Sequence, residues 1–236
     1  MATSGPSPEA TAPLDPNAQA PSSVQLVDGP MPKARALDLG AFAGISNRPA
    51  EGEGITYGPA VAWGIYARLE LRRWLGLRLY YREEYIPVTV ERGGFDTSTS
   101  FGDTDFDQPN LKLRSLGARL EPTWVVAPRL HVMAVIGASW LRFVAPPATS
   151  TGAFDIRTAD RSAVELDFQG GVGAAFELLP DWLTVGAQLT YGVSTQRSGT
   201  AYEDVQAFSD GKRYTLGALP RFDGVTDLLF SLGLLL

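Results

Sequence analysis

The most constraining feature of the sequence is a long alternation of apolar residues with small or polar ones. Between Ile55 and Leu71, the odd positions are mostly large and apolar, whereas the even positions carry Gly, Ala, Thr, Tyr, Arg or Glu. Residues two apart share one face of a β-strand, so this pattern predicts a strand with one apolar face and one small or polar face. Strands in globular proteins average about 5–6 residues. The greater length here is typical of a tilted strand that crosses a bilayer in a barrel wall.

The same alternation recurs along the chain and predicts about eight strands. The other alternating segments begin near Leu37, Leu75, Leu116, Leu130, Val164, Leu183 and Asp227. An even number of strands is usual for single-chain bacterial barrels. We therefore expect an all-β fold, an eight-stranded antiparallel up-and-down transmembrane barrel over residues 36–236.

The segments between the predicted strands alternate in length. Three short turns and four longer connections are expected, at residues 72–74, 127–129 and 179–182, and at 46–54, 91–110, 145–162 and 195–226. Short turns at one rim and long polar loops at the other match the asymmetry of outer-membrane barrels. Both ends of the barrel segment are then expected at the short-turn, periplasmic rim.

The two faces of the predicted strands indicate which side meets lipid. The large apolar face is almost free of charge, whereas the other face mixes Gly and Ala with charges of both signs. This second face is expected to form a charge network in the barrel interior: Arg68, Glu70, Arg78, Arg82, Glu84, Arg119, Glu121, Glu165 and Asp167. Apolar residues outside and paired charges inside favour a membrane barrel. A soluble barrel, such as a lipocalin-like binder, would reverse the two faces.

Aromatic residues are expected to mark the two edges of the lipid-facing band. Trp and Tyr concentrate at both interfaces of a membrane barrel. The predicted girdles consist of Trp74, Trp124 and Trp182 near the short turns, and of Tyr57, Tyr85, Trp140 and Tyr191 toward the long connections. Trp63 lies near the middle of its strand and fits neither girdle.

This pattern resembles the small eight-stranded outer-membrane barrels, the group that includes the OmpA transmembrane domain, OmpX and OmpW. The resemblance covers residues 36–236 and rests on strand number, loop asymmetry and the last alternating segment. That segment, DLLFSLGLLL from Asp227 to Leu236, is similar to the signal that the barrel-assembly machinery reads, although its final residue is usually aromatic. The resemblance implies a bacterial outer-membrane location, with outer-membrane lipid and lipopolysaccharide as neighbours.

Residues 1–35 differ from the rest of the chain. They hold seven prolines and no aromatic residue. Such a segment buries too little surface to offset the entropy of ordering it, so a disordered or extended periplasmic tether is predicted. The alternative is a peptide that docks on a periplasmic or membrane protein. The segment lacks the apolar stretch of a secretory signal, which we expect to have been removed already.

Composition excludes several classes of function. The chain has no Cys and a single His, His131, which excludes disulfides, thiolate metal sites and His-rich metal centres. A net charge of -6 argues against nucleic acid as a partner, because phosphate binding needs a basic face. No window approaches the roughly 18 apolar residues of a membrane-spanning helix. No cofactor is expected.

Three groups of residues are weighed as functional sites. The interior charges either plug the bore or line a narrow path; an eight-stranded barrel is just wide enough for side chains to fill, which favours the plug. Asp103, Asp105 and Asp107 resemble the start of a calcium loop, but the Gly and the distal Glu are missing, so a solvated acidic loop is expected. Arg72, Arg73 and Arg129 are either turn residues or contacts for lipid headgroups.

The expected function is that of a non-enzymatic anchor or interaction protein. The alternative is a narrow channel for ions or small solutes. The resemblance also raises a lipid-modifying enzyme, because some small outer-membrane barrels use Ser and His to cleave or transfer acyl chains. His131, however, lies beside a periplasmic turn with no evident Ser and carboxylate in its layer, so a triad is not expected.

Overall fold

The computed structural model describes residues 37–51, 54–91, 105–150, 157–209 and 212–236, within the compact unit Ala34–Leu236. The predicted tether, residues 1–35, and Asp103 of the candidate acidic loop lie outside the described residues.

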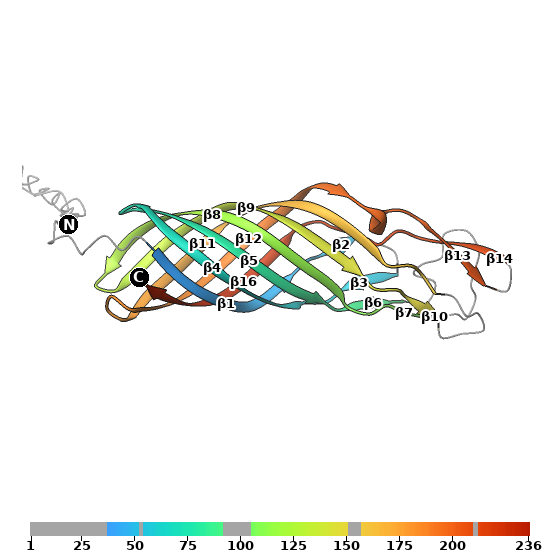
Figure 1. Cartoon of the computed structure of the whole chain (residues 1–236), viewed down its shortest axis with the longest axis horizontal. Coiled ribbons are helices and arrows are strands. Elements are labelled where there is room, and N and C mark those ends of the chain that lie inside the picture. The colour runs from blue at the N-terminus through green and yellow to red at the C-terminus, as the bar shows by residue number, and fades with distance from the viewer. Residues whose placement is uncertain (1–36, 52–53, 92–104, 151–156, 210–211) are drawn as a thin grey trace, which may run out of the picture. The chain divides into compact units, whose positions relative to one another are not determined.

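Eight long antiparallel strands form a closed barrel, as the alternation predicts (Figure 1). They are β1 (Leu37–Asn47), β4 (Ala60–Arg72), β5 (Leu75–Ile86), β8 (Leu111–Ala127), β9 (Leu130–Ala145), β11 (Arg161–Leu179), β12 (Leu183–Ser198) and β16 (Val225–Leu235). Each of these eight strands pairs with the barrel strand that precedes it and the one that follows it along the chain. β1 and β16 pair with each other and so close the barrel. The short turns between β4 and β5, β8 and β9, and β11 and β12 all lie at one end, which we call the turn side.

The long connections at the other end, the loop side, pair with one another in small two-stranded sheets (Figure 1). The pairs are β2 (Ala50–Glu51) with β15 (Arg221–Phe222), β3 (Ile55–Tyr57) with β6 (Val88–Val90), β7 (Phe106–Asp107) with β10 (Thr149–Ser150), and β13 (Val205–Ser209) with β14 (Lys212–Leu216). The 3-10 turn η1 (Thr200–Tyr202) lies among them. Three of these sheets join different connections, so the loop side is a coupled structure.

The alternating segment from Ile55 to Leu71 forms two strands instead of the single strand predicted. It is interrupted at Gly58 and Pro59, where the N–H of Gly58 donates to the carbonyl of Pro87 at 2.9 Å. Proline has no N–H to offer a sheet, which explains the break. β4 continues in the barrel wall, whereas β3 pairs with β6 outside the barrel sheet.

The sequence predicts polar long connections, but in the structure they are not polar throughout. Their apolar side chains pack with the loop-side ends of the barrel strands into one buried group, which we call the loop-side core. Its buried members are Ile55, Ala60, Ile86, Phe106, Leu111, Leu113, Leu141, Phe143, Ala145, Ala148, Ala163, Ala201, Leu216, Leu219 and Phe222. Phe222 is central, with its ring centroid 5.1 Å from that of Tyr57 and 5.4 Å from that of Phe143. Isolated apolar residues in a connection carry no periodicity, so the alternation cannot reveal such a core.

The outer surface of the barrel is apolar and the interior is polar. Val61, Ile65, Leu116, Ile136 and Val172 are exposed on the outside of the barrel. Exposed apolar surface on this scale is costly in water and suits a lipid environment. None of the helices in the described residues is long and apolar enough to span a membrane.

Candidate functional site: the barrel interior

The inward-facing side chains form a buried polar interior. The structure brings most of the predicted charge network together there, with Arg78, Arg82, Glu84, Arg119, Glu121, Glu165 and Asp167 buried and Arg68 partly buried. Glu70 is different, because its side chain is exposed beside the irregularity near the end of β4. Of the predicted network, Glu70 alone is exposed, and the other eight side chains are buried or partly buried.

Near the turn side, the carboxylate of Glu121 joins two arginines. Its oxygens lie 3.0 Å from Nε of Arg68 and 2.7 Å from Nε of Arg78. Nε2 of Gln188 also donates to Glu121 at 3.1 Å. The Arg78 guanidinium lies over the Tyr66 ring, 4.1 Å from its centroid. Burial of charge is tolerable only when partners surround it, and here every contact is supplied by side chains of other strands.

Arg119 extends this turn-side network toward the middle of the barrel. It donates to Oε1 of Gln188 at 3.1 Å and to Oε1 of Gln169 at 2.6 Å. Its guanidinium lies over the ring of Tyr80, 4.5 Å from the centroid. The Tyr80 hydroxyl donates to the same Gln169 oxygen at 3.3 Å. Aromatic faces and amides thus hold the Arg119 guanidinium, which forms no ion pair with a carboxylate among the described residues.

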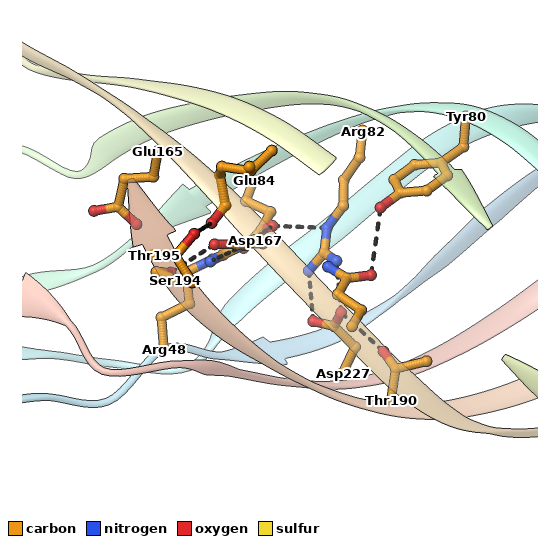
Figure 2. Close-up of polar contacts among 12 residues, drawn as sticks. Arg48, Tyr80, Arg82, Glu84, Glu165, Asp167, Thr190, Ser194, Thr195 and Asp227 are labelled. Carbon is orange, nitrogen blue, oxygen red and sulfur yellow. Dashed lines mark hydrogen bonds and ion pairs between the residues drawn. The ribbon is translucent and has the colours of Figure 1, made fainter. Parts of the chain in front are cut away.

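A second, loop-side network is built around Arg82 and Arg48 (Figure 2). Arg82 makes two parallel hydrogen bonds to Asp227, at 2.7 and 2.6 Å, and its Nε lies 2.7 Å from Glu84. Arg48 lies between Glu84 at 3.2 Å and Asp167 at 3.0 Å. The paired geometry of arginine and carboxylate is the strong, directional form of this contact.

Two of these residues, Arg48 and Asp227, were not among the predicted interior charges. Asp227 lies on the inward face of β16, as the alternation of that segment indicates, but the sequence gives no sign that it meets Arg82. Arg48 lies just beyond the end of β1. It is two residues after Ser46, so the alternation places both side chains on the inward face. Arg48 falls in the predicted connection 46–54, and continuing the alternation into that connection as far as position 48 predicts that its side chain faces inward.

The loop-side core continues directly from this network. The Arg48 guanidinium lies 5.6 Å from the centroid of the Phe222 ring. The Tyr202 hydroxyl hydrogen-bonds to Glu165, and Arg161 donates to the carbonyl of Gly217 at 2.9 Å. Burial and the Glu165 carboxylate raise the pKa of Tyr57 above its usual range. The connections thus cover the interior with bonded, buried side chains.

Side chains leave little free space in the middle of the interior. A cavity lined by Phe42, Arg78, Tyr80, Arg119, Gln188, Leu229 and Ser231 has a volume of about 10 Å³. That is room for one water molecule at most. In this conformation the cavity is far too small for a solute path.

Gly117 shows how closely the interior is packed. A Cβ atom at this position would lie 2.3 Å from Cζ of Tyr80, whose ring is held by Arg119 and Phe42. We expect Gly117→Ala to lower the free energy of unfolding by about 1–3 kcal/mol, because the buried ring must move. Urea unfolding in lipid vesicles measures it. The matched control is Gly170→Ala, where the nearest atom is 3.9 Å away and little change is expected. Equal stability of the two variants would contradict the close packing.

The predicted aromatic girdles are exposed, with one exception. Trp74, Trp124 and Trp182 are exposed toward the turn side, and Tyr85, Trp140 and Tyr191 are exposed on the outer wall. Tyr57 is not part of a girdle. It packs against the loop-side core, and its hydroxyl donates to the carbonyl of Pro220 at 3.0 Å. The break before β4 removes Tyr57 from the barrel wall and accounts for this difference.

The other candidate sites acquire little support. Contrary to expectation, a carboxylate does lie beside His131: Oε1 of Glu177 is 3.1 Å from its Nε2. Within the described residues, no serine hydrogen-bonds to His131. Asp105 and Asp107 are exposed, and the described residues contain no group of three or more metal-ligating side chains.

Comparison with known proteins identifies the fold alone. No protein-family model and no curated protein sequence matches the chain. Among solved structures, a major outer membrane protein from Thermus thermophilus is 14% identical, with a TM-score of 0.51 over 84% of this chain and 98% of that one.

Two further solved structures align more weakly. Neisserial surface protein A is 12% identical, with a TM-score of 0.47 over 85% of this chain and 97% of its own. Ail, the attachment invasion locus protein of Yersinia pestis, is 12% identical, with a TM-score of 0.43 over 84% and 97%. The chain has the fold of the small eight-stranded outer-membrane barrels, as its sequence pattern implies.

Proposed function

We propose that the protein is a non-enzymatic outer-membrane barrel that acts as a closed, rigid anchor. It presents the paired sheets of the loop side at the cell surface, while residues 1–35 contact a periplasmic or membrane partner. The observation that carries this proposal is the filled interior. A barrel whose bore is occupied by bonded side chains is suited to holding its connections in place.

The interior charges support an anchor because the two signs are balanced in number. Among the described residues, the arginines of the interior are matched in number by carboxylates. The two sets are Arg48, Arg68, Arg78, Arg82, Arg119 and Arg161, and Asp38, Glu84, Glu121, Glu165, Asp167 and Asp227. A path for ions usually carries an excess of one sign, which attracts the permeant species. The balance of signs, with four of the arginines in direct contact with carboxylates, favours a structural role instead.

An outer-membrane location is supported by the apolar outer wall and by the outer-membrane barrels that share the fold. We expect the protein in the outer-membrane fraction, with a gel mobility that shifts on boiling after detergent extraction. Such a shift reports a closed barrel that resists detergent. A protein that stays soluble without detergent and shows no shift would refute the membrane proposal.

Electrical recordings separate the anchor from the alternative channel. We expect the purified barrel, inserted in a planar lipid bilayer, to give no conductance steps above those of the protein-free bilayer, because the interior ion pairs would have to separate. Steady conductance that changes with Arg82→Glu or Glu121→Arg would establish the channel instead. Both variants must first show the boiling-dependent mobility shift, so that a silent bilayer is not simply a failure to fold.

Two further measurements test the partner and enzyme proposals. Capture of envelope proteins with the full chain and with a chain lacking residues 1–35 would show whether this segment recruits a partner.

His131→Ala is expected to leave the lipid A acyl pattern of the cell unchanged. A changed pattern would favour a lipid-modifying enzyme.

A further inference from the structure

A compact basic cluster interrupts the apolar outer wall of the barrel on β8 and β9. It consists of Lys112, Arg114 and Arg142, which share the outward face with Leu116 and Trp140. The Arg114 side chain is 57% exposed and that of Lys112 is 36% exposed. Cations on the lipid side of a barrel strand are destabilising unless they reach an interface or a partner. The cluster therefore needs an explanation.

The two arginines are direct neighbours across the sheet. Arg114 is paired in register with Arg142. Cα atoms of such pairs are about 4.5–5.5 Å apart, and like charges in this arrangement repel. Within the described residues, no acidic side chain lies within ion-pair distance of Arg142. Nothing in this part of the protein offsets the charge of that arginine.

A single carboxylate, Glu83, serves the rest of the cluster. Its oxygens lie 3.0 Å from Nε of Arg114 and 3.9 Å from Nζ of Lys112. The Tyr81 hydroxyl donates to it at 2.5 Å, so Glu83 is held in place. One negative charge against three positive charges leaves an excess of two. The cluster is thus positioned by the protein but not neutralised by it.

Aromatic side chains of the proposed loop-side girdle flank the cluster. Trp140 is two residues from Arg142 on the same face and is 62% exposed. Tyr85, 45% exposed, lies under Lys112, whose Nζ is 5.4 Å from the ring centroid. Exposed Trp and Tyr mark the headgroup level of a bilayer. The basic cluster therefore lies where lipid headgroups meet the wall.

We propose that Lys112, Arg114 and Arg142 bind the phosphate groups of a membrane lipid in the leaflet on the loop side of the barrel. A guanidinium group can donate two parallel hydrogen bonds to a phosphate, which is bidentate binding, and two adjacent arginines can share one phosphate. A bound phosphate would offset the repulsion between Arg114 and Arg142. Glu83 contacts Arg114 but not Arg142, so it offsets this repulsion only in part. This assignment rests on the proposed membrane-embedded orientation and adds a class of ligand to it.

The first test uses the unaltered full chain, folded in a neutral detergent. Binding of diphosphoryl lipid A, and of the same lipid after removal of its phosphates, is measured by native mass spectrometry. We expect at least tenfold tighter binding of the phosphorylated lipid. Equal affinities would overturn the proposal. Release of the lipid by millimolar inorganic phosphate would also overturn it, because the site would then recognise free phosphate.

The second test assigns the binding to the cluster. Arg114→Gln combined with Arg142→Gln is expected to weaken binding of the phosphorylated lipid about tenfold or more and to leave the dephosphorylated lipid unaffected. The matched control is Arg157→Gln with Arg221→Gln, which removes the same charge from exposed residues of the long connections. An equal loss in the control pair would contradict a specific site.

These outcomes are separable from a failure of the proposed function. A chain that shows no boiling-dependent mobility shift would refute the membrane barrel itself. A chain that shifts but binds both lipids equally would refute only the headgroup site.

Discussion

Replacing Arg82 with methionine is expected to lower the free energy of unfolding by about 3–5 kcal/mol. Arg82 is buried and is bonded to Asp227 through two hydrogen bonds and to Glu84 through Nε. Methionine fills much of the same volume but leaves the Asp227 carboxylate without its cation. Urea unfolding in lipid vesicles, followed by tryptophan fluorescence, measures the change.

A second variant separates lost pairing from lost packing. In Arg82→Met with Asp227→Leu, both members of the ion pair are replaced by apolar side chains. Replacement of a whole buried pair is often close to neutral, so much of the stability should return. As a surface control, Arg114→Met removes a half-exposed arginine and should have a small effect. If Arg82→Met is as stable as this control, the loop-side network contributes little.

Replacing Phe222 with alanine is also expected to lower the free energy of unfolding by about 3–5 kcal/mol, the usual range for a buried phenylalanine. Phe222 is fully buried and touches the rings of Tyr57 and Phe143, so its removal takes a shared contact from several connections. We expect the loss to be local. The loop side should become sensitive to added protease, while the boiling-dependent mobility shift persists.

The control for this change is Phe230→Ala. Phe230 is exposed on the outer wall of β16 and lies outside the loop-side core. Its removal should leave the protease pattern as it is in the unaltered chain. Faster cleavage in both variants would mean that the loop side does not depend on its own core.

The sequence predicts the barrel well because one simple rule governs its wall. Inward and outward residues alternate wherever a strand separates lipid from a filled bore, so strand number and sidedness follow from period two. The rule fails where strands leave the wall. By the alternation, Tyr57 should face outward from the barrel wall. It packs against the loop-side core instead, because the barrel strand β4 begins only after Pro59 and Tyr57 lies outside it.

The interior partners could not be derived in the same way. Parity places Arg82 and Asp227 inside, but their contact depends on the stagger of strands that are far apart in sequence. Arg48 lies past the regular strand, and Glu70 is exposed beside the irregularity near the end of β4. The pattern determines which face a residue takes. The three-dimensional register determines which residues meet.

The pairing of β1 with β16 has a consequence for how the barrel must form. The first strand of the barrel wall, β1, pairs on one side with the last, β16, so one edge of β1 has unpaired N–H and C=O groups until β16 has been made. Open edges invite pairing with other chains. Contacts between such distant segments also slow folding. During folding, the open edge of β1 must therefore be protected from pairing with other chains. This need ends when β16 pairs with β1 and closes the barrel.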